Sequence, residues 1–286
     1  MATPRVSPPR ISPVATRASR PPAESAGAVD AYRQSGFVLS EDIDAVIEGL
    51  NLEGAIAEAS SASRYRSQPM AAALMQWSRG WLTRLQALHA IEWGNYSSAI
   101  ALARVSADFQ AAEQLILNTD AREWLEWLEE PGISLAVEEH GTAFRLHAFR
   151  AAEVLARDGA LGDVYRQAAD LSMPHFGSTL LLAGAESDAG RVLATFGDRD
   201  FHFGLAQLGL GWLLALGAAR IADLVEREGP FHVPDPAPLQ RWVSRAQRLL
   251  ASGDRCRMRM LDDSPYRYVI DNWRRTPGAA AKRVLL

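Results

Sequence analysis

The stretch PMAAALMQWSRGWLTRLQALHAIEWGNYSSAIALARVSADFQAAEQLILN, residues 69–118, predicts two long helices joined by a tight turn. Pro69 suits the first turn of a helix, where its fixed φ fits and its missing N–H is not needed. Apolar residues then recur at three- and four-residue steps, the spacing of one helix face. These are Met70, Leu74, Trp77, Trp81, Leu85 and Leu88. Gly94-Asn95 can end this helix in the left-handed conformation, so we expect an antiparallel hairpin.

The second helix of the hairpin carries two apolar stripes, and both are expected to be buried. The first stripe has large side chains: Leu102, Val105, Phe109 and Ile116. The second has small ones: Ala99, Ala103, Ala107 and Ala111. A helix that is apolar on two sides is usually buried on two sides. We therefore place this helix at the centre of a core.

The remaining periodic segments predict an all-α fold, a single helical bundle of seven to nine helices built on the hairpin and covering residues 37–228. Its further helices include short ones expected near residues 120–128 and 142–157. Residues 1–36 are interpreted as a disordered tail rich in Pro and Arg, because they offer little apolar surface to bury. Residues 229–238 hold four prolines and predict a linker. Residues 239–286 are interpreted as a basic helix and tail, with a loose end from Asn272.

Composition limits the chemistry that the chain can offer. A hydrophobic content of 48% supports a sizeable core. One cysteine, Cys256, allows no internal disulfide and indicates a reducing compartment, so we expect a cytoplasmic protein. Six scattered histidines with that single cysteine do not predict a structural zinc site. No phosphate-binding loop or hydrolase motif is found, and we predict no metal and no cofactor.

Charge is distributed unevenly along the chain. Residues 1–33 hold five arginines against two acidic residues, and residues 241–286 hold 11 basic residues against four acidic ones. The body, residues 34–240, holds 14 arginines against 28 acidic residues. An acidic body between two basic ends predicts self-association through charge or contact with an acidic partner.

The basic helix expected after residue 238 is the candidate partner-binding element. Arg241, Arg245 and Arg248 share one side of it, and Trp242, which could stack on bases, lies on the other side with Ala246 and Leu249. Three interpretations besides a solvated surface remain open. The arginines can dock on the acidic body of the same or another copy, bind another protein, or bind nucleic acid or an anionic membrane.

Residues 201–219 contain no charged side chain apart from a protonatable His202, and this length would reach across a membrane. A buried central helix is the alternative. It is favoured by Gln207, by the glycines of the segment and by the charged run that follows from Arg220.

Two sets of polar residues resemble a known family. Arg84 and His89 match the R-x4-H pattern of RNA-cleaving toxins of the HEPN type. A wider pattern over residues 70–228 is similar to bacterial helical proteins related to the HEPN and abortive-infection families. It comprises Gly94, Tyr96, Ala99 and Arg104, followed by Tyr165, Leu171, Ser172 and His175. The resemblance implies an all-α bundle that is often dimeric. The positions four to six before His175 hold no arginine, which departs from the catalytic members.

The catalytic candidates are therefore His175, Tyr165, Ser172 and Arg104. His175 would be the acid–base group, because histidine titrates near neutrality, and Arg104 would hold an anion. Each also has a structural interpretation. Tyr165 can be a core aromatic, Ser172 and His175 can serve a helix end, and Arg104 can pair with Asp108 one turn away.

The sequence leaves three functions open. The favoured one is a non-enzymatic helical interaction or scaffold protein that acts through its basic ends and binds a protein partner or itself. The second is a HEPN-like nucleic-acid-directed defence protein with ribonuclease activity. The third is a subunit of a membrane-associated or large assembly.

Overall fold

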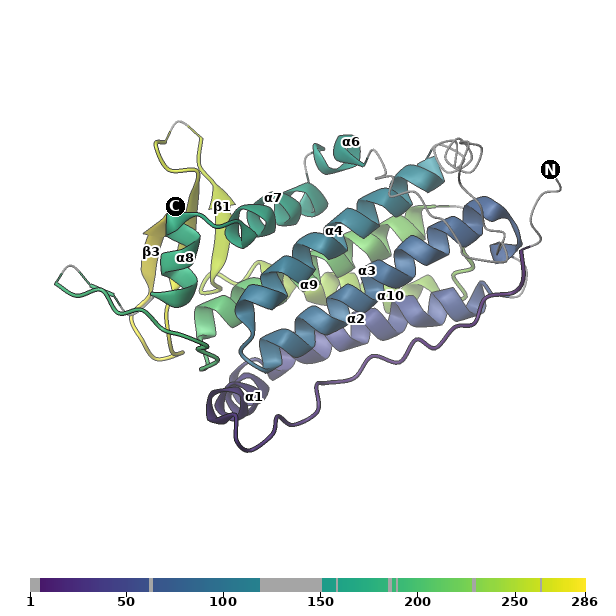
Figure 1. The fold of residues 1–286 in the computed structure, drawn as a ribbon. Coiled ribbons are helices and arrows are strands. Elements are labelled where there is room, and N and C mark those ends of the chain that lie inside the picture. The colour runs from purple at the N-terminus through teal and green to yellow at the C-terminus, as the bar shows by residue number, and fades with distance from the viewer. Residues whose placement is uncertain are drawn as a thin grey trace, which may run out of the picture.

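A computed structural model describes residues 6–61, 64–118, 151–157, 159–184, 187–188, 190–227, 230–262 and 264–286. Its helices are α1 (Ala26–Val38), α2 (Ser40–Ala59), α3 (Gln68–Glu92), α4 (Tyr96–Asn118), α6 (Ala152–Leu155), α7 (Ala160–Ser172), α8 (Phe176–Ala183), α9 (Phe203–Glu226) and α10 (Pro236–Leu250), with a 3-10 turn at Arg64–Arg66. The strands are β1 (Arg257–Met260), β2 (Tyr268–Trp273) and β3 (Lys282–Leu285). The expectation of a mostly helical bundle is confirmed (Figure 1).

The predicted hairpin is present as α3 and α4. The Ser67 hydroxyl accepts a hydrogen bond from the Met70 N–H at 3.4 Å, so it caps the first turn of α3. Gly94 ends the hairpin's first helix with a φ of 71°. A Cβ at Gly94 would lie 2.0 Å from the Arg199 carbonyl oxygen, so glycine is required here for space as well as for φ.

The two stripes of α4 are buried unequally. All four alanines are at most 3% exposed, and Ile116 is 1% exposed. Leu102, Val105 and Phe109 are only half-buried, and the Arg79 guanidinium lies 4.0 Å from the centroid of the Phe109 ring. The expectation that the large stripe is core is therefore wrong except for Ile116. The small side chains face the interior because they let neighbouring helices approach closely.

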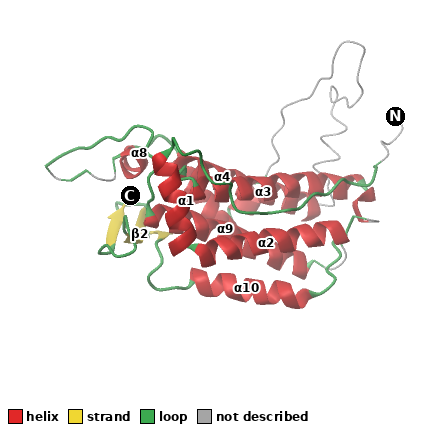
Figure 2. Cartoon of the chain, turned by 90° about the horizontal axis from the view of Figure 1, so that it is seen from below, coloured by secondary structure: helices red, strands yellow, loops and turns green. Residues whose placement is uncertain are grey.

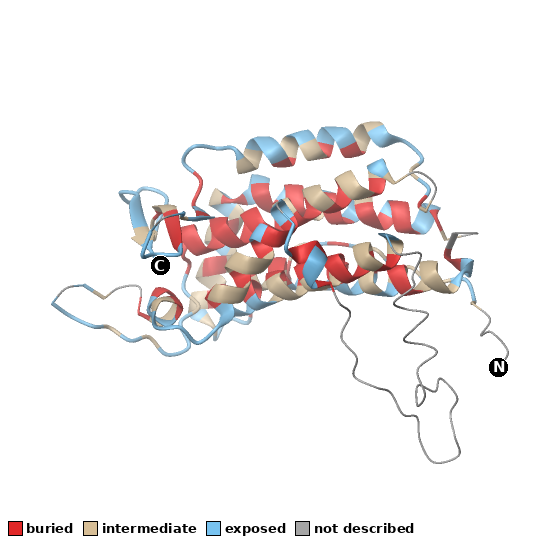
Figure 3. Ribbon diagram, turned by 90° about the horizontal axis from the view of Figure 1, so that it is seen from above, coloured by how far each residue is buried: buried red, intermediate tan, exposed pale blue. Residues whose placement is uncertain are grey.

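Helix α9 runs through the middle of the bundle and packs against α2, α3, α4, α7 and α10 (Figures 1 and 2). It is the one described helix long and apolar enough to cross a membrane, but 67% of its most apolar window is buried inside the protein. Buried residues form a continuous band through the bundle (Figure 3). These observations favour a buried core helix over a membrane span for residues 201–219.

The N-terminal segment corrects the prediction of a disordered tail over residues 1–36. From residue 6 it runs along α2 and α3 and leads into α1 (Figure 1). The Ala15 N–H donates to Asn51 Oδ1 at 2.9 Å, and the Ala18 N–H donates to Glu92 Oε2 at 2.7 Å. Both alanines are buried. Composition failed as a guide because backbone hydrogen bonds and small side chains anchor this segment.

The linker and tail also differ from prediction. Phe231, within the Pro-rich stretch 229–238, is buried edge-on against Trp77 with 5.2 Å between ring centroids. Helix α10 already begins at Pro236. Residues beyond α10 form an antiparallel sheet in the order β1-β2-β3, and β3 lies within the range from Asn272 that was expected to be loose. Met258 pairs with Ile270, and Ile270 with Val284, so one column of apolar side chains crosses the sheet.

The helices expected near residues 120–128 and 142–157 fall largely outside the described residues. Within the second of these ranges, the described portion contains α6 (Ala152–Leu155).

Candidate functional site

The four catalytic candidates do not form one constellation. Arg104 and Tyr165 do meet across α4 and α7, with the guanidinium carbon 5.8 Å from the ring centroid. Arg104 also lies 3.9 Å from Asp108, the partner expected one turn along the same helix. Ser172 instead donates its hydroxyl to the Ala169 carbonyl at 2.8 Å, a local helix-end contact.

His175 lies at the N-cap position of α8 with an exposed side chain that makes no capping hydrogen bond. Among the described contacts, none joins His175 to Tyr165 or Arg104. Tyr96, from the first part of the family pattern, accepts a hydrogen bond from the His202 N–H at 2.9 Å and so anchors the start of α9. Tyr96 and Ser172 thus make structural contacts, whereas the His175 side chain makes no hydrogen bond among the described contacts.

The R-x4-H pair is also divided between two environments. Arg84 is buried and bonds to Glu53, whereas the His89 ring reaches outward to the Thr16 carbonyl, with Nε2 at 2.8 Å. Five residues along a helix turn the side chains about 140° apart, which explains the separation. The two residues share no pocket that could hold a scissile phosphate.

The predicted partner-binding face of α10 is only partly available. Trp242 is 2% exposed, and its Nε1–H donates to the Ala45 carbonyl at 2.7 Å, so its assignment to a binding surface is wrong. Arg245 is tied to Glu48 of α2 at 2.7 Å. Arg241 and Arg248 remain exposed, with no ion-pair partner among the described residues.

Much of the basic C-terminal region is engaged by the acidic body of the same chain. Arg255 pairs with Asp42 of α2, and the Arg267 Nε lies 3.2 Å from Asp170 of α7. Arg275 reaches Asp198 and Asp200 at 4.0 and 3.8 Å. The charge asymmetry of the sequence therefore serves, to a large extent, to attach the sheet and α10 to the bundle.

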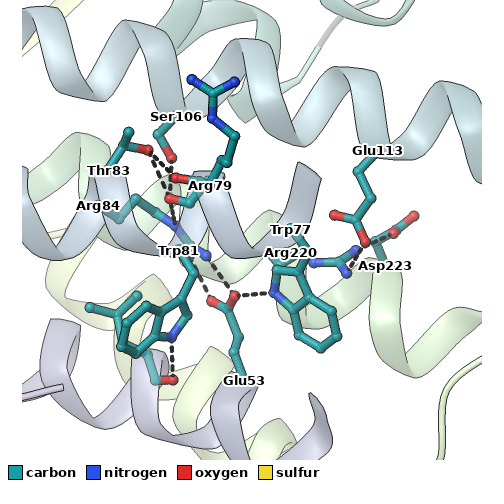
Figure 4. A network of polar contacts seen from close by, with 12 residues as sticks. Glu53, Trp77, Arg79, Trp81, Thr83, Arg84, Ser106, Glu113, Arg220 and Asp223 are labelled. Carbon is teal, nitrogen blue, oxygen red and sulfur yellow. Dashed lines mark hydrogen bonds and ion pairs between the residues drawn. The ribbon is translucent and has the colours of Figure 1, made fainter. Parts of the chain in front are cut away.

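Inside the bundle lies a cluster of buried ion pairs that sequence patterns did not identify (Figure 4). Arg84 of α3 binds Glu53 of α2 through two hydrogen bonds of 2.6 and 2.5 Å. The Trp77 Nε1–H donates to the same carboxylate at 3.0 Å. Two parallel hydrogen bonds from a guanidinium to a carboxylate form a strong, directional pair. The third donor, the Trp77 Nε1–H, helps to replace the hydrogen bonds to water that the Glu53 carboxylate loses on burial.

A second ion pair completes the cluster. Arg220 of α9 binds Glu113 of α4, and its other terminal nitrogen donates to Asp223 at 3.0 Å. Its guanidinium carbon lies 4.5 Å from the centroid of the Trp77 ring. Trp77 thus joins the two pairs through its edge and its face, and the cluster links α2, α3, α4 and α9.

Burial raises the pKa of Glu113 to about 8, although the positive charge of Arg220 acts in the opposite direction. The Glu113 carboxyl therefore titrates in the neutral range. No solvent-lined cavity opens on it among the described pockets, so this titration bears on stability more directly than on chemistry.

A cavity of about 330 Å³ lies beside the cluster. Residues 10–13 of the N-terminal segment line one side, and Leu74, Trp77 and Trp81 of α3 line the other. The Trp81 Nε1–H donates to the Leu50 carbonyl at 2.8 Å, and the Glu53 carboxylate is already satisfied. The mostly apolar walls of this cavity can accept an apolar group, and Arg10, Ser12 and Ser78 are its other polar lining residues. No three His, Cys, Asp or Glu side chains gather as metal ligands in the described part of the chain.

Comparison of the chain with protein-family models, with curated proteins and with solved structures found no match.

Proposed function

We propose that the protein is a non-enzymatic interaction protein that binds a protein partner at the end of the molecule formed by α8 and the sheet. The observation that carries this proposal is a group of exposed apolar side chains, called here the α8 surface. It comprises Met173 (50% exposed), Phe176 (83%) and Leu180 (38%). Grouped apolar exposure of this kind is typical of interaction sites.

Contact between α8 and the chain end makes this surface continuous. A Cβ at Gly177 would lie 3.3 Å from Leu286 Cδ2, so the helix packs closely on the last residue. The C-terminus, β3 and α8 also lie together in Figures 1 and 2. The side chain of the last residue therefore borders the α8 surface.

The border of the α8 surface is basic, and this selects the kind of partner. Lys282 on β3 is exposed and has no ion-pair partner among the described residues. Arg283 shares the single Asp271 carboxylate with Arg259, and Arg267, whose side chain is 60% exposed, is paired with Asp170. A second copy docked by the same surface would bring like charges together, which disfavours a symmetric dimer there. The charge pattern fits a protein that presents apolar side chains flanked by carboxylates.

The exposed Arg241 and Arg248 of α10 support nucleic acid as a second candidate partner. They are seven residues apart and so lie on the same side of the helix. Nucleic-acid binding would depend on these two arginines and on salt, but not on Phe176. The positions of Arg84, His89 and His175 give a ribonuclease mechanism no support.

Substitution of Phe176 by Asp tests the proposal, with Phe37→Asp as the matched control. Phe37 lies on α1 and is 85% exposed, so both variants should fold as the wild type does. Each protein would be used to capture partners from the native host, and the recovered partner would be purified and its affinity measured directly. We expect Phe176→Asp to lose the partner and Phe37→Asp to keep it.

Three outcomes would overturn the proposal. Equal binding by both variants would exclude the α8 surface. A wild-type dimer that Phe176→Asp converts to a monomer would make the partner a second copy. Retention of RNA that depends on Arg241 and Arg248, with no protein bound at α8, would favour the nucleic-acid alternative.

A further inference from the structure

A second cavity, of about 220 Å³, lies between α7, α9 and the start of β1. Its walls are chemically divided. Val164 of α7 and Leu208 and Trp212 of α9 give it an apolar side, and Arg255 and Arg257 line the side formed by the chain as it enters β1. This cavity is separate from the one beside the buried ion pairs and from the α8 surface.

Arg255 supplies a buried donor that the protein itself leaves unused. The residue is 3% exposed, and its terminal nitrogens bind the Asp42 carboxylate and the Gln207 carbonyl. Its Nε is fully buried and has no hydrogen-bond partner. A buried donor without an acceptor is destabilising, so an acceptor supplied by a ligand would be favourable.

Gly211 places this donor at the cavity wall. A Cβ on Gly211 would lie 3.2 Å from the Arg255 Nε and 3.4 Å from its Nη2, and both residues line the cavity. The absence of a side chain on α9 therefore lets the guanidinium lie against the helix at the edge of the open space.

The charges around the cavity leave one positive charge unbalanced. Arg255 is neutralised by Asp42, and Asp163 at the rim is paired with Arg166 at 2.6 Å. Arg257 is exposed and has no ion-pair partner among the described residues. A ligand with a single negative charge would balance Arg257 while its oxygen accepts from Arg255.

We propose that this cavity binds a small carboxylate with one negative charge and an apolar, preferably aromatic, body. The carboxylate oxygens accept hydrogen bonds from the Arg255 Nε–H and from the Arg257 guanidinium. The apolar body lies against Val164, Leu208 and Trp212. The Trp212 Nε1–H is already bonded to Oε1 of Gln167, another residue of the cavity wall, at 3.0 Å. Division into a small polar end and a larger apolar wall is typical of small-molecule sites.

Titration calorimetry of the full chain with phenylacetate tests this proposal, with 2-phenylethanol as an uncharged analogue and inorganic phosphate as an anion without an apolar body. We expect one saturable site for phenylacetate and much weaker binding of both analogues. Arg257→Gln should weaken phenylacetate binding roughly tenfold, the usual effect of losing a charge-assisted contact. Arg241→Gln removes an exposed arginine elsewhere and should bind as the wild type does.

Gly211→Ala provides an independent check on location, because its Cβ crowds the Arg255 guanidinium. Gly211→Ala should also weaken phenylacetate binding. If Gly211→Ala lowers the melting temperature, its weaker binding could come from damage to the fold, and the location of the site is then judged from Arg257→Gln alone. Absence of saturable phenylacetate binding to the wild type would overturn the proposal. Equal affinity of Arg257→Gln and wild type, or tighter binding of phosphate or 2-phenylethanol, would overturn it as well.

Discussion

The indole ring of Trp242 lies directly on the backbone of Gly49, where a Cβ would come within 2.3 Å of Cζ2. A Cβ at Gly217 of α9 would come within 2.9 Å of Cη2 of the same ring. Trp242 thus inserts between α2 and α9 at positions where both helices lack a side chain. Its Nε1–H bond to the Ala45 carbonyl fixes the ring in that slot.

Gly49→Ala should therefore destabilise the protein by about 1–3 kcal/mol, the usual range for overpacking a well-filled core. Gly80→Ala is the matched control, since Gly80 is also within a helix but its nearest neighbour would lie at an ordinary 3.5 Å. That control should be neutral or slightly stabilising, because alanine favours helix more than glycine does. Chemical denaturation measures the unfolding free energy of the Gly49→Ala and Gly80→Ala variants. An equal effect of the two substitutions would contradict the tight contact.

Loss of one partner of the Arg84–Glu53 pair should be severe. Arg84→Met leaves the fully buried Glu53 carboxylate without its guanidinium, and we expect a loss of about 3–5 kcal/mol in unfolding free energy. Arg104→Met breaks a pair whose side chains are 38% and 41% exposed, and it should cost less than about 1 kcal/mol. The double variant Glu53→Gln, Arg84→Met should recover part of the loss. A mild Arg84→Met effect would mean that water reaches Glu53.

Stability should depend on pH through two buried groups with opposite shifts. The pKa of Glu113 is raised from 4.5 to about 8, so its favourable contribution is complete below pH 4.5 and is lost as pH rises through 8. Burial lowers the pKa of His202 from 6.5 to about 4, and the nearby Arg275 acts in the same direction. The His202 contribution is complete above pH 6.5 and is lost as pH falls towards 4.

The two slopes oppose each other between pH 4.5 and 6.5, so a decline attributable to Glu113 should emerge between about pH 6.5 and 8. Each group changes the unfolding free energy by roughly 1.4 kcal/mol per pH unit at most. Glu113→Gln should flatten the decline in unfolding free energy that occurs as pH rises above 6.5. His202→Asn removes the opposing slope, so the unfolding free energy should fall more steeply as pH rises from 4.5 to 6.5. Denaturation curves across this range give the answer, and an unchanged profile for Glu113→Gln would contradict the raised pKa.

The N-terminal segment should stabilise the bundle through a few specific positions. Ala15 is 4% exposed while its neighbour Val14 is 71% exposed. Ala15→Asp should therefore lower the melting temperature and increase quenching of Trp77 and Trp81 by acrylamide, because the segment would lift from the cavity that they line. Val14→Asp should change neither quantity. If both variants behave as the wild type does, the segment contributes no stability.

Local patterns in the sequence were sufficient for the helical hairpin. Pro69, the three- and four-residue apolar spacing and Gly94 act within one or two helical turns, so their consequences can be derived without knowing the rest of the chain. The alternation of Arg255, Arg257 and Arg259 with Cys256, Met258 and Met260 was an equally local signal. It has the period of a strand, and it could have indicated β1, where we predicted no element.

Composition was a weaker guide, because it averages over residues that act individually. The prolines and arginines of residues 1–36 predicted disorder, yet Ala15, Ala18 and Arg17 anchor the segment to Asn51 and Glu92. The excess of basic residues at the C-terminus predicted an available binding face. Arg245, Arg255 and Arg267 are instead attached to carboxylates more than 90 residues away in the sequence.

The sequence by itself determined that the chain is mostly helical, that residues 69–118 form an antiparallel hairpin and that acidic and basic regions are segregated. Periodicity and charge are properties of the chain, so they can be read before it folds. Only the tertiary structure decided that Trp242 lies in the slot between Gly49 and Gly217, that Arg84 and His89 separate and that Arg255 keeps a free donor beside Gly211. Contacts between distant residues depend on which helix faces meet, and burial of a charge or an indole is defined only once they have met.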